Sequence, residues 1–241
     1  MKLSTIYCLI ILGIVPAYSI AQNVQLHYDF RHTLDPGLNE KNFPMVSFEY
    51  FKEFDSFGSF LFKAQSFLNG KKYNVGETFI QFSQSLKFWN PTAFLSLNYS
   101  GGLGVAGTGF GYHISSAYAV GIAVPLEWKG VYLTWNAQYR YTAFHTASHD
   151  VQLIFYLWKG MLDYRLVLAG SIVSWTENRN QGTEFTSHLS GKKFAFFGDT
   201  QLWYQLEGGF SLGTRINLYY NVLGGESNFK VYPTLGMQYK L

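Results

Sequence analysis

The sequence predicts an all-β fold, a transmembrane antiparallel β-barrel of about twelve strands with long external loops and short periplasmic turns. Three observations lead to this fold class. Polar and apolar residues alternate in segment after segment, which is typical of strands with one wet and one apolar face. The connections between these segments alternate between long and short. Charged residues make up only 14% of the chain and aromatic residues 19%, whereas about 25% of an ordinary soluble domain is charged.

The segment Val131–Thr142 shows the alternation most clearly. Its odd-numbered positions are apolar or aromatic, and every even-numbered side chain can form hydrogen bonds. The segment is long enough to cross a bilayer as a tilted strand, for which roughly 9–11 residues suffice. Aromatic residues at both ends of the apolar face, and Arg140 on the polar face, favour a membrane barrel with a hydrated interior over a soluble sheet.

The N-terminus has the features of a secretory signal peptide over residues 1–21, which leaves residues 22–241 for the barrel. Lys2 precedes the apolar run Ile6–Val15, and Ser19-Ile20-Ala21 forms a small-x-small cleavage site. The apolar run is too short for a spanning helix, and no later segment offers the ~18 apolar residues that such a helix needs. We therefore expect a protein of the Gram-negative outer membrane. Cys8 is the only cysteine, so the mature chain is expected to have neither disulfides nor thiol chemistry.

The first six predicted strands each place apolar residues at alternate positions. In the first, the even-numbered residues 24–30 are apolar and the odd-numbered residues 25–31 are polar. The turn residues Asp35-Pro36-Gly37 follow it, a tight turn at 55–58 follows the second strand, and Trp89-Asn90-Pro91 follows the fourth. The glycine-rich stretch 101–111 precedes the sixth, whose inward positions are small. The segments are Val24–Arg31, Val46–Glu53, Ser59–Phe67, Glu77–Phe88, Thr92–Ser100 and His113–Val124.

The last six predicted strands continue the pattern. Residues 126–130 turn into the seventh, Lys159-Gly160 turns into the ninth, and 174–192 is the longest loop. The tenth strand is the least regular. The segments are Val131–Thr142, Val151–Leu157, Met161–Val173, Lys193–Leu206, Phe210–Val222 and Lys230–Leu241. An even number of strands, with connections that alternate long and short beginning with a long one, is expected of a barrel with a periplasmic N-terminus. A soluble sandwich has no reason to show this alternation.

The C-terminus agrees with this architecture. Residues Thr234–Leu241 follow the order polar-x-Gly-x-x-aromatic-x-apolar, which resembles the assembly signal of outer-membrane barrels. The expected partners are therefore outer-membrane lipid and the barrel-assembly machinery, which would bind the C-terminal strand. Pro233 lacks an N–H and removes one ladder hydrogen bond, for which we expect a local bulge.

The predicted inward-facing side chains include charges of both signs, amides and aromatic rings. Two interpretations remain open. The charges could form internal salt bridges that fill a narrow lumen, or they could line a channel of mixed charge that discriminates weakly by ion sign and offers hydrogen bonds to polar solutes. The candidate pore-lining and solute-binding residues are Asp29, Arg31, Glu49, Phe51, Lys63, Gln65, Gln81, Tyr132, Asn136, Gln138, Arg140, Asp163, Arg165, Arg215 and Asn217.

Two other motifs formally match a nucleotide-binding site and a catalytic triad, but neither interpretation is favoured. Residues 102–107 match G-x-G-x-x-G, but a dinucleotide site needs a helix directly afterwards, and a β-patterned run follows instead. His145, Ser148 and His149 share one external loop, yet neighbours in sequence rarely form a catalytic triad. The sequence predicts no cofactor and no metal site. The net charge is +3 with scattered basic residues, which argues against a nucleic-acid surface.

Residues Phe48-Glu49-Tyr50-Phe51, Phe54–Gly58 and Glu77–Ile80 make the chain similar to the Tsx-like nucleoside-specific channel-forming porins of the outer membrane, in particular a Bacteroidetes branch described as a domain of unknown function. The resemblance spans most of the mature chain by strand count. It implies a monomeric twelve-stranded barrel through which nucleosides diffuse past weak sites of aromatic and ionisable residues. Glu49, Tyr28 and Arg31 are the positions that match the family pattern.

These observations lead to one favoured hypothesis and two alternatives. The favoured hypothesis is a passive outer-membrane channel for small polar solutes, with nucleosides as the solute that the resemblance implies, and with no enzymatic activity. One alternative is an outer-membrane barrel enzyme that acts on lipid through the loop 145–149. The other is a plugged structural barrel.

Overall fold

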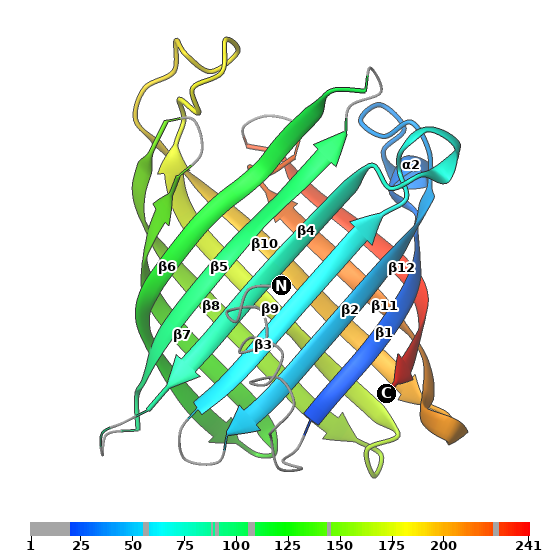
Figure 1. Ribbon diagram of the computed structural model, residues 1–241. Helices are drawn as coiled ribbons and strands as arrows, with labels where there is room; N and C mark the ends of the chain where they lie inside the picture. The colour runs from blue at the N-terminus through cyan, green and yellow to red at the C-terminus, as the bar shows by residue number, and fades with distance from the viewer. Residues whose placement is uncertain are drawn as a thin grey trace, which may run out of the picture.

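The computed structural model describes residues 20–54, 58–87, 89, 92–105, 109–143, 146–223 and 227–241. Twelve strands in this part of the chain form one closed antiparallel barrel (Figure 1). Each strand pairs with its neighbours in sequence, and β1 closes the barrel by pairing with both β2 and β12. The predicted fold class is confirmed. Closure leaves no unpaired sheet edge.

The strands differ in length but all can cross a bilayer when tilted. They are β1 (Ile20–Asp29), β2 (Phe43–Phe54), β3 (Gly58–Phe67), β4 (Glu77–Leu86), β5 (Phe94–Val105), β6 (Gly111–Trp128), β7 (Val131–Thr142), β8 (Ser148–Met161), β9 (Leu166–Asn178), β10 (Lys192–Gln205), β11 (Phe210–Tyr220) and β12 (Phe229–Lys240). The described residues of the connections hold one short helix, α2 (Arg31–Leu34), and the 3-10 turns η1 (Lys71–Tyr73) and η2 (Glu207–Gly209). No helix in the described part of the chain is long and apolar enough to cross a membrane.

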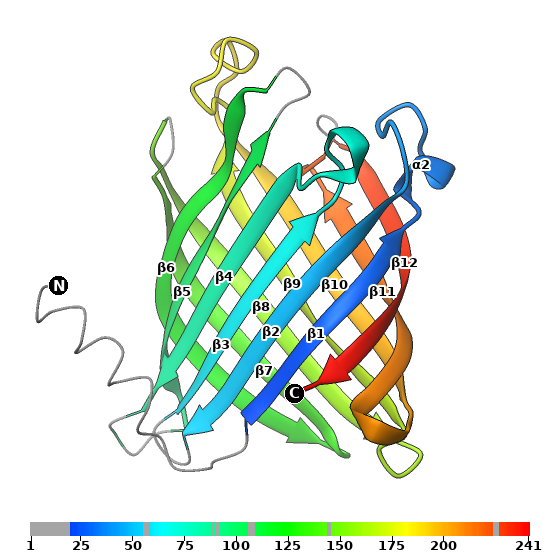
Figure 2. The ribbon, with the colours of Figure 1, turned by 45° about the vertical axis from the view of Figure 1, so that its right-hand side comes forward.

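The connections separate into two classes at the two ends of the barrel. Long ones, such as 30–42, 68–76 and 179–191, lie at the upper end in Figure 2, which we call the loop end. Short ones, such as 129–130 and 206–209, lie at the lower end, which we call the turn end. β1 begins and β12 finishes at the turn end, where Asn23 pairs with Lys240. The predicted alternation of long and short connections holds for most of the barrel, but the connection 87–93 at the turn end is longer than 106–110 and 143–147 at the loop end.

The two faces of the wall differ as predicted. On β1, Val24, Leu26 and Tyr28 point outward and are exposed. The intervening residues Gln25, His27 and Asp29 point inward and are at most 1% exposed. The outer face also has a row of aromatic contacts across neighbouring strands, with ring centroids 4.9–6.2 Å apart between Phe62, Phe82, Tyr99 and Tyr118. Such pairs stabilise a sheet beyond their area burial.

The predicted turn at Lys159-Gly160 is wrong. Strand β8 continues to Met161, and residues 162–165 turn instead, with φ of 51°, 52° and 63° at Leu162, Asp163 and Tyr164. The ring of Tyr164 lies against Gly160, where a Cβ would be only 2.3 Å from it, and stacks on Trp158 at 6.0 Å. Gly160 therefore makes room for a ring within the strand instead of forming the turn.

Consequently, the prediction that Asp163 and Arg165 face the lumen is wrong. Both lie in the exposed turn at the turn end of the barrel. Arg31 also differs from its prediction, since β1 ends at Asp29 and Arg31 begins helix α2. Its side chain is nevertheless buried, at 7% exposure.

Pro233 causes no bulge, because the register of β12 runs unbroken against both neighbours. The carbonyl of Pro233 accepts from the N–H of Phe30, so this residue presents its polar backbone groups to the β1 side. β1 ends one residue earlier, at Asp29 opposite Thr234. Pro233 has no N–H to donate to the carbonyl of Phe30, which accepts from the N–H of Leu34 instead. The expected loss of one ladder hydrogen bond therefore occurs without a bulge.

The glycine-rich stretch is partly strand and partly outside the described residues. Gly101, Gly102 and Gly104 belong to β5, while residues 106–108 are among those not described. No helix follows, since β6 begins at Gly111. This agrees with the reading of the G-x-G-x-x-G match as unrelated to nucleotide binding.

Candidate functional site

The inner face of the barrel is polar on nearly every strand. Strand β6 differs, because its inward positions hold the small residues Ala117, Ala119, Gly121 and Ala123. The side chains of Asn136 and Gln138 on β7 extend past this strand and donate to the Ser96 hydroxyl on β5, at 3.1 and 3.0 Å. The small residues of β6 thus provide the space in which side chains of β7 and β5 form hydrogen bonds with each other.

Four charged side chains form a network across the lumen, which we call the luminal bridge: Glu49, Lys63, Asp199 and Arg215. The Lys63 ammonium lies 2.6 Å from the Asp199 carboxylate and 3.3 Å from that of Glu49. Arg215 donates to Glu49 at 3.1 Å. Charges that leave water need such partners, because an isolated buried charge is very costly.

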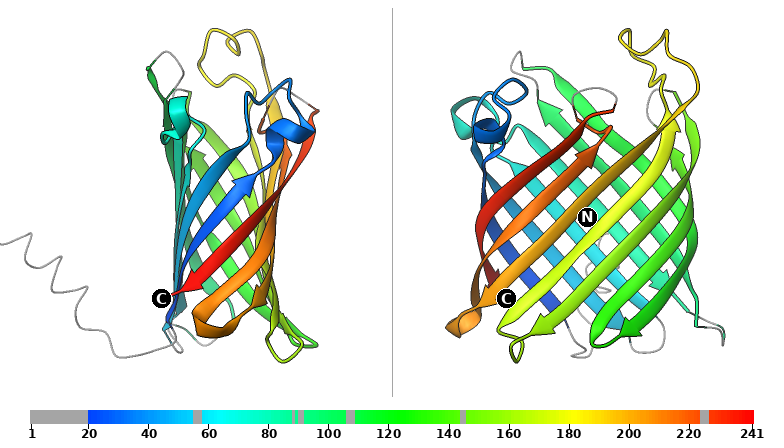
Figure 3. Two further views of the ribbon diagram at one scale, coloured as in Figure 1. Left: turned by 90° about the vertical axis from the view of Figure 1, so that its right-hand side faces the viewer. Right: turned by 180° about the vertical axis from the view of Figure 1, so that it is seen from behind.

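The luminal bridge joins opposite walls. β3, which carries Lys63, and β10, which carries Asp199, are separated by several strands in either direction around the barrel. The barrel is flattened, with a broad profile in Figure 1 and a narrow one in the left panel of Figure 3. A lysine and an aspartate can therefore span the lumen directly. A second crossing joins Gln81 on β4 to the Tyr156 hydroxyl on β8, at 3.1 Å.

Asp199 is held in place by its own wall. The Ser171 N–H and hydroxyl on the neighbouring strand β9 donate to its carboxylate at 2.9 and 2.6 Å. Asp199 is 1% exposed. The position of the Asp199 carboxylate is therefore fixed by its own wall, independently of its contact with Lys63.

A layer of neutral groups lies beside the luminal bridge. Trp203 donates to Gln201 at 2.9 Å, and its ring contacts His27 edge-on at 5.5 Å. His27 hydrogen-bonds to both Gln25 and Thr234, at 3.0 and 2.9 Å. Glycines leave room for these two rings. A Cβ at Gly213 would lie 2.5 Å from Trp203, and one at Gly236 would lie 2.6 Å from His27.

Some buried polar atoms retain unused hydrogen-bonding capacity. The Nε and Nη1 of Arg215 and the Nδ2 of Asn217 make no hydrogen bond to any described residue, although both side chains are buried. The Ser47 and Ser211 hydroxyls are in the same situation. Buried polar groups are normally satisfied. Neighbouring side chains also cover these atoms, so a polar solute in the lumen could reach them only if those side chains moved.

At the loop end, Arg31 closes one side of the barrel interior. It forms hydrogen bonds of 3.1 and 2.8 Å with Asp29, and its guanidinium lies 4.8 Å from the Phe43 ring and 5.1 Å from the Tyr232 ring. Cation–π contacts of this kind contribute about 0.5–2 kcal/mol each. The first loop is thereby anchored to the wall.

The same loop is tied down at Asp35, which accepts hydrogen bonds from Lys230 and from the Tyr232 hydroxyl. The hydrogen bond from Lys230 lowers the pKa of Asp35 below its ordinary value of 3.8. A depressed carboxyl pKa adds stability that is present above the unfolded-state pKa and is lost as the pH falls through the folded-state pKa.

We therefore expect Asp35→Asn, which mimics the protonated acid, to loosen this loop at neutral pH. The measurement is amide hydrogen exchange of residues 31–39 in micelles, where the variant should exchange faster than the wild type at pH 7. The two proteins should converge in acid, at a pH low enough to protonate Asp35, whose pKa lies below its ordinary value. Equal exchange at pH 7 would contradict this role of Asp35.

The predicted site residues fall into several groups. Those that are buried on the inner face are Asp29, Lys63, Gln65, Asn136, Gln138, Arg140, Arg215 and Asn217. Glu49 and Gln81 also point inward and are partly exposed. Phe51 and Tyr132 lie near the turn end at inward register positions and are 39% and 52% exposed. Asp163 and Arg165 lie in a turn, as described above. A role of any of these residues in solute binding stays a prediction.

Sequence reasoning did not select several residues of this interior, among them Gln25, His27, Asp199, Gln201 and Thr234. Asp199 could have been found from its strand, because it lies two residues before Gln201 on the same face. Ser171 could not, because its role depends on the neighbouring strand β9.

The Ser148 loop does not form a triad in the described residues. Ser148 points inward and donates to Asp150, which also lies 2.5 Å from Lys192. His149 points outward, where its ring contacts Tyr139 and Tyr141. Neighbouring residues on a strand face opposite sides, so Ser148 and His149 diverge. His145 lies outside the described residues.

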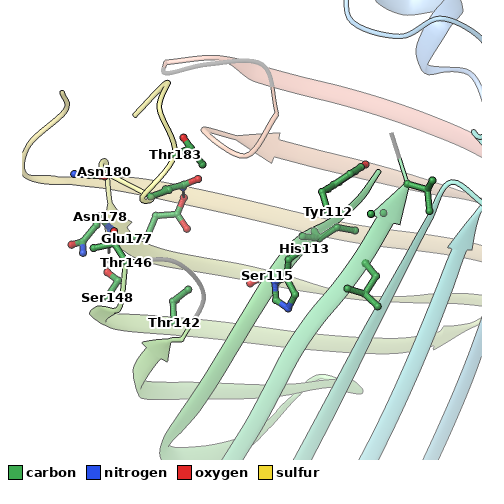
Figure 4. A pocket seen from close by; sticks show the side chains of 16 residues that line it. Tyr112, His113, Ser115, Thr142, Thr146, Ser148, Glu177, Asn178, Asn180 and Thr183 are labelled. Carbon is green, nitrogen blue, oxygen red and sulfur yellow. Dashed lines mark hydrogen bonds between the residues drawn. The ribbon is translucent and has the colours of Figure 1, made fainter. Parts of the chain in front are cut away.

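Two of the cavities in the described part of the chain open at the loop end. The larger, about 840 Å³, lies between β5 and β6 on one side and the end of β9 with its following loop on the other, and we call it the outer vestibule (Figure 4). The smaller, about 320 Å³, lies beside Arg31, Asn39 and Tyr232. The described residues contain no group of three or more His, Cys, Asp and Glu side chains arranged for a metal ion.

Residues 21–241 match the family model described as Domain of unknown function (DUF5020). No curated protein matches the sequence significantly. Among solved structures, the barrel is similar to the NanC porin, with a TM-score of 0.55 and 8% identity over 92% of this chain and 100% of that chain. The KdgM porin has a TM-score of 0.48 and 9% identity over 92% and 99% of the two chains. LpxR from Salmonella typhimurium has a TM-score of 0.48 and 8% identity over 92% and 100%. At these identities the similarity to NanC shows a shared fold.

Proposed function

Because the chain belongs to the DUF5020 family and has a porin fold, we propose that it is a passive outer-membrane channel for small polar solutes. The loop end faces the outside, and the C-terminal strand β12 is the element that the barrel-assembly machinery binds. The barrel works as a monomer in outer-membrane lipid.

The observation that supports a channel most strongly is that Arg215 and Asn217 have hydrogen-bond donors in the lumen that are unpaired among the described residues. Both side chains are buried, yet each keeps donors that make no hydrogen bond to a described residue. A lumen built only for rigidity would satisfy such groups internally, because each unsatisfied one costs about 1–3 kcal/mol. Such donors would form transient hydrogen bonds with a passing solute once the side chains that cover them move apart.

The charge pattern supports solutes that are neutral overall. The luminal carboxylates of Asp29, Glu49 and Asp199 each lie next to a cation, at 2.6–3.3 Å. Paired charges leave little net field to select ions by sign. Aromatic rings at inward register positions that are exposed, such as Phe51 and Tyr132, offer faces to planar groups. Nucleosides, which combine a planar base with hydroxyl groups, are therefore the solute that we propose.

This proposal is tested by swelling of liposomes that contain the purified barrel. We expect uridine and thymidine to enter faster than glutamate or lysine, and the two amino acids to enter at rates within about twofold of each other, because the luminal charges are balanced. Liposomes that contain the heat-denatured protein serve as the control. Entry of glutamate or lysine at more than about tenfold the rate of the other would contradict the neutral channel.

A second candidate function is a closed structural barrel. The observation that favours it is the contact between Lys63 and Asp199 across the lumen. Liposomes that stay impermeable to every solute in the panel would support this candidate over the channel. The lipid-enzyme alternative has no comparable support, since Ser148 and His149 point to opposite sides of the wall.

A further inference from the structure

The outer vestibule has two chemically different walls. β5 and β6 supply one wall, on which Tyr112 and Ile114 provide an aromatic ring and an apolar side chain. Leu103 and Val105 also line this wall, but they lie at outward register positions of β5. The opposite wall, from β9 and its loop, supplies Glu177, Asn178, Asn180, Gln181 and Thr183. Figure 4 shows Tyr112 and His113 on one side of the cavity and Glu177, Asn178 and Asn180 on the other.

The Tyr112 ring is fixed with one face toward the cavity side. Its hydroxyl donates to Glu77 at 2.7 Å. Its other face lies against Gly104, where a Cβ would be 2.2 Å from the ring. Tyr112 is still 42% exposed. A held ring with one open face is a stacking platform, and it loses little conformational freedom when a ligand binds.

The Glu177 carboxylate is held and neutralised, but it is not saturated. Lys193 and Gln181 bind its Oε1 at 3.0 and 3.1 Å, and Trp175 donates to its Oε2 at 2.9 Å. An ionised carboxylate has about four acceptor positions, so room for about one further donor remains. Glu177 is the only Asp, Glu, Lys or Arg that lines the described vestibule. An ionic ligand would find no free countercharge there.

We propose that the outer vestibule binds a neutral saccharide. The apolar face of a pyranose ring matches the open face of Tyr112, and its hydroxyls match the amides, hydroxyls and carboxylate of the opposite wall. A volume of about 840 Å³ lies within the range of ligand pockets, roughly 300–1,000 Å³, and accommodates a short oligosaccharide. A nucleoside fits less well, because the wall opposite Tyr112 presents amides and hydroxyls and not a second ring.

This inference goes beyond the proposed channel, since binding in the outer vestibule requires no conduction. Isothermal titration calorimetry of the full-length barrel in detergent micelles tests it with three probes: maltotriose, thymidine and trigalacturonate. We expect saturable binding of maltotriose, and weaker or no binding of the other two. Tyr112→Ala should weaken the binding of maltotriose about tenfold, and Tyr112→Phe, which keeps the ring, by less than about threefold.

A matched control is available on the same strand. Tyr118 points outward from β6 and is exposed, so Tyr118→Ala should leave maltotriose binding unchanged. Heat-modifiable migration on gels verifies that each variant has folded. Gly104→Val provides a second variant, because its side chain would displace the Tyr112 ring, and it should weaken binding as Tyr112→Ala does.

Three results would overturn the proposal. These are no saturable binding of maltotriose, tighter binding of thymidine or trigalacturonate, or unchanged binding of maltotriose to Tyr112→Ala. The failure of the channel would look different. A barrel that binds maltotriose but leaves liposomes impermeable retains the vestibule site and loses the channel, and a permeable barrel that binds no saccharide does the reverse.

Discussion

Lys63→Ala is expected to raise the single-channel conductance of the barrel several-fold and to lower its free energy of unfolding by about 3–5 kcal/mol. Lys63 lies between the carboxylates of Asp199 and Glu49, at 2.6 and 3.3 Å, and its side chain is 10% exposed. Its removal leaves two carboxylates without this cation and takes away the side chain that crosses the lumen. Planar-bilayer recording measures the conductance, and urea unfolding in lipid vesicles measures the stability.

Two further variants separate the luminal bridge from general damage. Lys129→Ala removes a lysine from an exposed turn and should change neither quantity. The double variant Lys63→Ala with Asp199→Ala should cost less stability than the sum of the two single changes, because the two groups interact directly. Additive costs would mean that Lys63 and Asp199 do not stabilise each other. An unchanged conductance in Lys63→Ala would mean that the luminal bridge does not limit passage through the barrel.

Leu97→Lys is expected to destabilise the barrel by about 2–4 kcal/mol in lipid, because it places a charge on the lipid-facing surface. Leu97 lies within β5, is 39% exposed and pairs with the outward residue Val120. The adjacent Asn98 points inward, where its amide donates to Ser96 at 3.2 Å. Asn98→Lys should therefore cost less than about 1 kcal/mol, since its ammonium enters a polar lumen.

Unfolding of the two variants in vesicles, followed by tryptophan fluorescence, provides the comparison. The substitutions add the same side chain at neighbouring positions of one strand, so strand propensity and position along the strand are nearly matched. A larger loss in Asn98→Lys than in Leu97→Lys would contradict the assignment of the two faces.

The sequence predicted the bounds of a strand best where polar and apolar residues alternate without interruption. The predicted segment Val131–Thr142 coincides with β7, because every second side chain meets lipid and the others meet the lumen. The prediction was wrong at 159–165, where Gly160 provides space for the Tyr164 ring and the turn comes later. A glycine that packs against a ring cannot be distinguished from a turn glycine by sequence alone.

The sequence predicted several residues of the candidate site, but it did not predict the contacts between them. Alternation identified Glu49, Lys63 and Arg215 as inward-facing, because it depends only on neighbouring residues. The contact between Lys63 and Asp199 joins residues 136 positions apart and depends on barrel closure and on the flattened cross-section. The outer vestibule was not predicted, since Tyr112 and Glu177 come from different strands that meet only when the barrel closes.

The central claim is that this wall separates water inside from lipid outside, residue by residue. Cys8 lies in the predicted signal peptide, so single cysteines at positions 95–98 of β5 can be placed in a mature chain without another thiol. Reaction with a charged, membrane-impermeant thiol reagent in vesicles measures the access of water to each position. We expect Asn98→Cys to react, Leu95→Cys and Leu97→Cys to stay protected, and Ser96→Cys to react more slowly than Asn98→Cys, because position 96 is buried against the amides of Asn136 and Gln138. Equal reactivity at all four positions, or the reverse pattern, would contradict the account.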